Sequence, residues 1–146
     1  MNRFKGSFAL LSAAVITIVI ASGSCKKSSS NSSALTKENL AGVYTLTALS
    51  VTLGPLSQDI LDSVPACQRD DQYDLKVDLT YLYNDVGVQC NPPGDGSGHW
   101  SISGTTLTID STQSTVQKFD GKTLVLSTPI TYNNISVTAT ETLTKH

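Results

Sequence analysis

Basic residues are scarce in this sequence of 146 residues, and they do not cluster. Between residues 40 and 146, five lysines and arginines stand against eleven aspartates and glutamates, a formal charge of −6. Neutralising the phosphates of a nucleic acid requires a basic patch or stripe. We therefore expect no nucleic acid partner, and we interpret the acidity as a contribution to solubility.

Histidine is scarce as well, because only His99 and His146 are present. A serine–histidine–aspartate hydrolase needs a histidine base beside its nucleophile, and the Gly-x-Ser-x-Gly elbow that often carries this nucleophile is missing. Glu141 is the one glutamate between residues 40 and 146, so a second carboxylate for acid–base catalysis is not evident. We predict no catalytic residue, and we interpret His99 as a surface residue of a strand.

Metal-binding patterns are missing among the cysteines and the acidic residues. The three cysteines include no Cys-x-x-Cys pair with a nearby histidine, which argues against zinc. Asp70, Asp71 and Asp74 could supply oxygen ligands to calcium, but their spacing is not that of an EF-hand loop. An acidic start to a strand, with Asp74 facing solvent, is the alternative that we favour. We predict no metal and no other cofactor.

One long apolar run is present, at residues 8–21, and it follows two basic residues. It is short for a membrane-spanning helix, and polar sequence follows it, as in a secretory signal. Cys25 comes directly after small residues, which resembles the lipidation motif of bacterial lipoproteins. The resemblance implies that residues 1–24 are a cleaved signal peptide and that Cys25 carries lipid, followed by a serine-rich tether up to residue 39. A secreted protein with Cys25 as a spare thiol is the alternative.

Four short stretches between residues 98 and 127 alternate large apolar residues with serine and threonine. The apolar residues two positions apart are Trp100 and Ile102, Leu107 and Ile109, and Leu124 and Leu126. A period of two places one face of a strand on a core and the other in water. Short turns with glycine, at Ser103-Gly104 and Asp120-Gly121, separate the stretches. We therefore predict an antiparallel meander.

Similar patterns on both sides of the meander extend the sheet. We expect strands at residues 42–51 with a bulge near Ala48, at 72–78, at 80–84 and at 134–144, with 87–90 as a further edge. A short helix at 58–64 is expected to cover one end of the sheet. About eight strands, with the last pairing back onto the first, predict an all-β, small antiparallel up-and-down barrel. A two-sheet sandwich is the alternative.

Several motifs resemble the lipocalin-like lipoproteins of Bacteroidetes. Besides the signal, they are the opening at residues 40–47 and the segments 65–71, 98–104 and 139–144. Gly42-Val43-Tyr44 takes the place of the Gly-x-Trp opening of lipocalins, with tyrosine where tryptophan is usual. The resemblance implies a lipocalin-like barrel over residues 40–146, and it implies no settled biochemical activity.

Cys67 and Cys90 are predicted to form a disulfide. Both follow the export signal, and compartments outside the cytoplasm permit such bonds. Cys67 precedes one strand of an expected hairpin and Cys90 follows the other, which brings both to one end of the sheet. Two free thiols are the alternative.

Seven residues are candidates for a ligand site. They are Tyr44, Tyr73, Tyr81, Tyr83, Trp100, Leu124 and Glu141. Ligand pockets are mostly apolar and aromatic, but a small barrel can also be filled by its own side chains. Glu141 is in phase with the inward residues of the last strand. We expect it to form a salt bridge at the rim, with the binding of a polar ligand head as the alternative.

We expect an envelope protein that is anchored by lipid in the outer membrane and faces the periplasm. Its partners are then the membrane and a small hydrophobic or amphipathic ligand, which the barrel binds without catalysis. The alternative is a structural or protein-interaction module with a filled barrel and a contact surface on the loop at residues 91–97. A cavity lined by Tyr83, Trp100 and Leu124 would separate the two hypotheses.

Overall fold

The computed structural model of the chain describes residues 33–132 and 134–146. The predicted signal peptide, the predicted lipid attachment at Cys25 and most of the predicted tether lie outside these residues. In the described part of the chain, no helix combines the length and the apolar character needed to cross a membrane.

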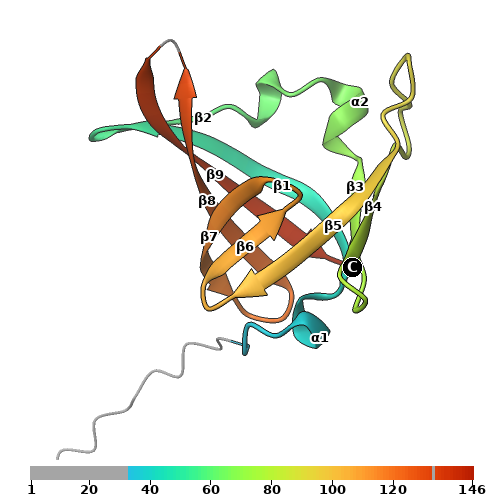
Figure 1. Ribbon diagram of the computed structural model, residues 1–146. Coiled ribbons are helices and arrows are strands. Elements are labelled where there is room, and N and C mark those ends of the chain that lie inside the picture. Colours follow the sequence, from blue (N-terminus) through green and yellow to red (C-terminus); the bar gives the residue numbers. More distant parts are fainter. Residues whose placement is uncertain (1–32, 133) are drawn as a thin grey trace, which may run out of the picture.

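An antiparallel sheet of nine strands makes up most of the described residues (Figure 1). Its strands are β1 (Gly42–Leu53), β2 (Leu56–Asp59), β3 (Gln72–Leu75), β4 (Thr80–Asn84), β5 (Gly96–Ser103), β6 (Thr106–Ile109), β7 (Thr112–Phe119), β8 (Thr123–Tyr132) and β9 (Ile135–Lys145). Because β1 also pairs with β9, eight strands close into a barrel, and β2 lies outside this ring as a partner of β1. The predicted all-β up-and-down barrel is confirmed, and its closure excludes the sandwich.

Strand β1 pairs with three other strands, and it contains a bulge. Its first residues pair with β3, its last residues with β2, and most of its length with β9. The register against β9 shifts between Leu46 and Ala48, which confirms the predicted bulge. A bulge adds one residue to a strand and so changes which residues face inward. Tyr44 faces the interior before the bulge, and Leu49 and Val51 face it afterwards.

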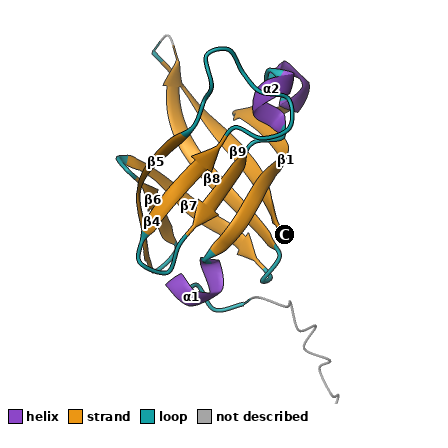
Figure 2. Ribbon diagram, turned by 90° about the vertical axis from the view of Figure 1, so that its right-hand side faces the viewer, coloured by secondary structure: helices purple, strands orange, loops and turns teal. Residues whose placement is uncertain are grey.

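Apolar side chains fill one end of the barrel, which we call the closed end. Helix α1 (Lys37–Leu40) lies across this end (Figures 1 and 2). Leu40 is fully buried, and its carbonyl accepts a hydrogen bond of 2.7 Å from the hydroxyl of Tyr44. Trp100 is buried there too, and its indole N–H donates to the carbonyl of Lys76 at 3.0 Å. The remaining buried core residues are Leu75, Leu107, Val116, Phe119, Leu124, Leu126 and Leu143.

The central meander forms as its alternation predicts. Trp100, Leu107, Leu124 and Leu126 are all buried on the inner face, and the strands pair with their neighbours in sequence order. Gly104 and Gly121 occupy the turns with φ of 57° and 93°, a backbone conformation that glycine adopts without steric cost. The predicted hairpins at these two positions are confirmed.

The strand predicted at residues 72–78 is shorter in the structure. β3 ends at Leu75, and Val77, which would share the face of Tyr73 and Leu75 if the strand continued, is 47% exposed. A turn begins at Lys76, whose carbonyl accepts from the amide of Leu79. The carboxylate of Asp78 accepts from the amide of Thr80 at 3.0 Å, which fixes the start of β4. Local side-chain bonding of this kind outweighs the apolar alternation.

Two further expectations were wrong. Residues 58–64 do not form one helix: the segment ends β2 and continues as a 3₁₀ turn, η1 (Leu61–Ser63). The carboxylate of Asp59 accepts from the amide of Leu61 and so stops the strand. Residues 87–90 form no strand, because β4 pairs directly with β5 and the amides of Val88 and Cys90 are bonded by aspartates.

Candidate ligand-binding site

A cavity of about 580 Å³ lies inside the barrel, above the packed core. Its floor consists of buried side chains: Tyr44, Leu75, Leu107, Leu126 and Leu143. Its outer edge is exposed and includes Ile130 and the turn between β6 and β7 at Asp110, Ser111 and Thr112. The walls between them are Leu49, Val51, Ile60, Tyr73, Tyr81, Ile109, Ser114, Thr128, Ala139 and Glu141. The cavity therefore connects the core with solvent, at what we call the open end.

The walls are mostly apolar, and two of their hydroxyl groups form a pair. The hydroxyls of Ser114 on β7 and Thr128 on β8 lie 2.6 Å apart and bond to one another. One hydroxyl of the pair donates to the other, which keeps its own O–H free to donate. Ligand sites in proteins typically enclose roughly 300–1,000 Å³ and are lined by apolar and aromatic side chains. The cavity matches this description in volume and in lining.

Three tyrosines on β3 and β4 form one wall of the open end. Tyr73 faces Tyr83 across the strand pair, and their ring centroids are 4.8 Å apart. The ring of Tyr81 lies 6.4 Å from that of Tyr73. Tilted rings at these distances attract one another beyond the area they bury. Burial raises the pKa of Tyr73, and nearby Glu141 and Asp71 raise it further. The hydroxyl of Tyr73 therefore stays protonated at neutral pH.

Tyr81 is fixed by Asp110, which lies in the turn between β6 and β7 with φ of 51°. The Tyr81 hydroxyl donates to Oδ2 of Asp110 at 2.7 Å, and Oδ1 accepts from the amide of His99. This bond raises the pKa of Tyr81 to about 12. A side chain at Gly98 would collide with both Asp110 and Tyr81, so glycine is needed where they cross β5.

A second, smaller cavity of about 150 Å³ lies against the helix α2 (Ala66–Arg69). It is lined by Leu46, Val64, Gln68, Asp71, Tyr73, Tyr83, Glu141 and Leu143. Tyr73, Glu141 and Leu143 line the larger cavity as well, so the two adjoin along β3 and β9. The smaller cavity differs in chemistry, because two carboxylates and two tyrosines lie around it.

Asp71 is the most deeply buried acid of the described residues, with 2% of its surface exposed. Its Oδ2 accepts a short hydrogen bond from the hydroxyl of Tyr83. Its Oδ1 is buried without a hydrogen-bond partner. Burial and this bond raise the pKa of Tyr83, so the tyrosine holds its proton and acts as the donor. One oxygen of Asp71 is thus fixed, and the other has no partner within the described chain.

Glu141 lies on the inner face of β9 and lines both cavities. The expected salt bridge at the rim was wrong: the ion pairs among residues 33–132 and 134–146 join Lys37 to Glu38, Arg69 to Asp62 and Lys118 to Asp120. No lysine, arginine or histidine side chain within these ranges lines either cavity. Burial raises the pKa of Glu141.

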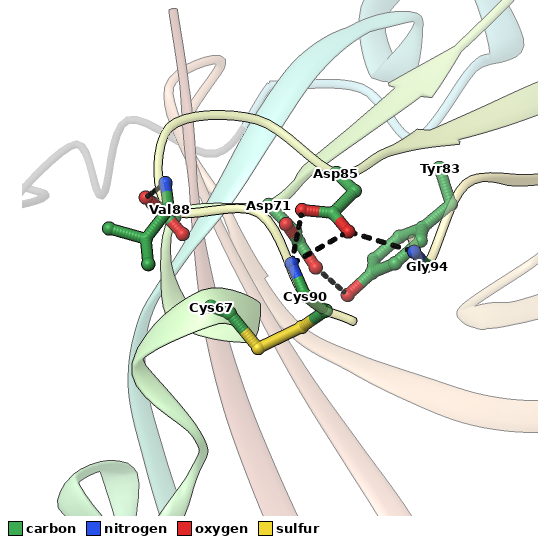
Figure 3. The surroundings of a disulfide bond; sticks show 8 residues. Cys67, Asp71, Tyr83, Asp85, Val88, Cys90 and Gly94 are labelled. Atoms are coloured by element: carbon green, nitrogen blue, oxygen red, sulfur yellow. Dashed lines mark hydrogen bonds between the residues drawn. A yellow bond between two sulfur atoms is a disulfide. The ribbon is translucent and has the colours of Figure 1, made fainter. Parts of the chain in front are cut away.

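The predicted disulfide between Cys67 and Cys90 is confirmed (Figure 3). It joins α2 to the loop that follows β4, with Cα atoms 5.0 Å apart. Asp85 organises the same loop, since Oδ2 of its buried carboxylate accepts from the amides of Cys90 at 3.0 Å and Gly94 at 2.8 Å (Figure 3). Together these contacts hold α2 beside the smaller cavity.

The structure divides the seven candidate residues between the two ends of the barrel. Tyr44, Tyr73, Tyr81 and Glu141 line the larger cavity, and Tyr83 lines the smaller one. Trp100 and Leu124 line neither cavity, because they pack in the closed end beside α1. The open cavity is therefore bounded by the tyrosines, and the tryptophan belongs to the core.

The other polar residues considered in the sequence do not form a shared site. His99 is exposed on the face of β5 opposite the buried Trp100, as predicted. Asp70 accepts from the amide of Val88, whereas Asp71 accepts from Tyr83. Within residues 33–132 and 134–146, no group of three histidine, cysteine, aspartate or glutamate residues is arranged to hold a metal ion.

Some lining residues were not identified from the sequence. Leu49 and Val51 line the cavity because the bulge changes which residues of β1 face inward. Ile60 lines it because it follows β2, and its amide donates to the carbonyl of Leu49. The change of apolar phase at the bulge was a signal for the first two. Nothing local marks Asp71 as a cavity residue, since its partner Tyr83 is brought to it by strand pairing.

Residues 40–126 match the model of a protein family described as a lipocalin-like domain. No curated protein matches the chain. No solved structure matches it either.

Proposed function

The chain belongs to the lipocalin-like domain family, and on that basis we propose that its barrel binds one small hydrophobic or amphipathic molecule without catalysing a reaction. The observation that carries the proposal is the cavity of about 580 Å³, which runs from a buried apolar floor to an exposed edge. A barrel that its own side chains filled would leave no such space.

Binding rather than catalysis is supported by the ionisable groups at the cavity. Those that line it are Tyr44, Tyr73, Tyr81, Asp110 and Glu141. All three tyrosines have raised pKa values, so their hydroxyls stay neutral near pH 7. A nucleophile with a base and an orienting group, which hydrolytic catalysis requires, cannot be assembled from this set.

We also propose a location in the cell, and this part of the proposal is based on the sequence. A signal-like segment followed by Cys25 supports lipidation of that cysteine, and several acyl chains give a stable anchor. The protein is then an envelope lipoprotein of the outer membrane that faces the periplasm. The membrane and the ligand are its two partners.

The test is a titration of the purified protein with Nile red, a neutral dye that fluoresces in apolar surroundings. We expect saturable binding with one site per chain. Ala139→Phe places a large side chain in the cavity and should reduce the affinity at least tenfold. Thr140→Phe, on the neighbouring outward-facing position of β9, is the matched control and should bind as the unchanged protein does.

Circular dichroism of both variants verifies that the barrel is retained. Equal dye binding by Ala139→Phe and Thr140→Phe would place the dye outside the cavity. That result, or the absence of saturable binding, would contradict the proposed function.

A further inference from the structure

The smaller cavity has an unusual balance of charge, and we call four of its residues the acidic subsite: Asp71, Tyr73, Tyr83 and Glu141. Two carboxylates line a space of about 150 Å³, and both raise the pKa of Tyr73. None of the basic side chains in residues 33–132 and 134–146 lines either cavity. Gln68 supplies the one other polar side chain of the lining.

Asp71 provides the first sign that a partner is missing. Its side chain is 98% buried, since 2% of its surface is exposed, and its Oδ1 has no hydrogen-bond partner. A buried carboxylate oxygen without a partner costs stability, and proteins rarely keep one without a functional reason. The other oxygen is held by Tyr83, so the carboxylate has a fixed orientation.

Glu141 provides the second sign. It lies on β9, whereas Asp71 directly precedes β3, and it forms no ion pair or side-chain hydrogen bond within the described chain. Two carboxylates in one partly buried space repel one another, and a cation between them removes this cost. An anion placed there would meet two like charges instead.

The tyrosine rings favour one kind of cation. The rings of Tyr73 and Tyr83 lie 4.8 Å apart and line the same space as the carboxylates. Aromatic faces attract ammonium groups, and this attraction grows where water is excluded. Two carboxylates with two aromatic rings match an organic amine better than a metal ion, which prefers more oxygen ligands.

Building on the proposed function, we propose that the ligand of this barrel is a cationic amphiphile: an apolar body in the larger cavity and a protonated amine in the acidic subsite. The cavities adjoin at Tyr73, Glu141 and Leu143, so one molecule can occupy both. The subsite then selects against fatty acids, whose carboxylate would lie beside Asp71 and Glu141.

The test compares three probes with the same chain and different heads: decylamine, decanol and decanoate. Each displaces Nile red from the purified protein at pH 7. We expect decylamine to displace the dye at a concentration at least tenfold lower than decanol, and decanoate to be the weakest. Glu141→Gln should reduce the preference for decylamine over decanol at least fivefold.

The matched control is Asp74→Asn, which removes a carboxylate from the same strand as Tyr73 but on the alternate face, away from both cavities. This variant should keep the preference for the amine. Equal displacement by decylamine and decanol, or an equal effect of both variants, would overturn the inference and leave the proposed function intact. Failure of the unchanged protein to bind Nile red or any of the three probes would overturn both.

Discussion

The hydroxyl of Tyr83 on β4 donates to Oδ2 of Asp71, the residue directly before β3. This bond fixes a buried carboxylate between the barrel wall and α2. It also leaves the second oxygen of Asp71 buried without a hydrogen-bond partner. The candidate site therefore contains a polar pair that is held in place but only half satisfied.

Removing that hydroxyl should be costly. Tyr83→Phe leaves both oxygens of Asp71 without a partner, and an unpaired buried polar group costs roughly 1–3 kcal/mol of unfolding free energy. Urea unfolding measures the loss. Tyr81→Phe is the matched control, because its partner Asp110 is exposed and can bond to water, so we expect a loss of less than about 1 kcal/mol. Equal losses would show that the burial of Asp71 is not the cause.

Glu141→Gln should stabilise the protein near pH 7. Burial raises the pKa of Glu141 above its ordinary value of 4.5, so the folded state holds the proton more tightly than the unfolded chain. The stability linked to this proton is complete below the unfolded pKa and is lost as the pH rises through the folded value. The advantage of Glu141→Gln over the unchanged protein should therefore grow between pH 4 and pH 7. Urea unfolding at several pH values measures it.

Asp110→Asn is the control of opposite sign. Hydrogen bonds from the amide of His99 and the hydroxyl of Tyr81 lower the pKa of Asp110. Its contribution is present above the unfolded pKa and disappears as the pH falls through the folded value. Asp110→Asn should therefore be less stable than the unchanged protein near pH 7, and the difference should shrink in acid. If the stability of both variants, relative to the unchanged protein, changed with pH in the same direction, the opposite pKa shifts of Glu141 and Asp110 would be contradicted.

Loss of the disulfide should loosen the open end before the rest of the barrel. Replacing Cys67 and Cys90 together by serine removes a link across 23 residues, which should cost about 3 kcal/mol. Hydrogen exchange should then increase at the amides of Val88, Cys90 and Gly94, and not in the meander at Leu107. A similar increase in exchange in this loop and in the meander would mean that the bond stabilises the barrel as a whole.

Trp100→Ala should affect stability and not the ligand. Trp100 is buried in the closed end and lines neither cavity, so its removal should cost roughly 3–5 kcal/mol. The affinity for Nile red of the fraction that remains folded should be unchanged. Thermal unfolding and the dye titration measure the two effects separately. A large loss of affinity with little change in melting temperature would place Trp100 at the ligand instead.

The sequence predicts the strands well where one face is buried, because apolar and polar residues then alternate and show which residues face inward. Trp100, Leu107, Leu124 and Leu126 show this in the meander. It fails where short-range bonds by aspartates end a strand, as at Asp78 and Asp59. It also fails to separate a tryptophan in the core from a tyrosine in a cavity wall. That distinction depends on α1, which closes one end, and no local pattern marks which end is filled.

The position of Ser33 has a consequence for how such a barrel would be oriented. Its amide donates to the carbonyl of Phe119 at 3.0 Å, at the closed end and beside the turn that leads into β8. Ser33 is the eighth residue after Cys25, and even a fully extended chain over that span reaches only about 29 Å. A chain anchored at Cys25 would hold its sealed base toward the bilayer and its mouth toward the aqueous compartment. Loading and release would then take place by exchange with that compartment, without direct extraction from the lipid to which the protein is attached.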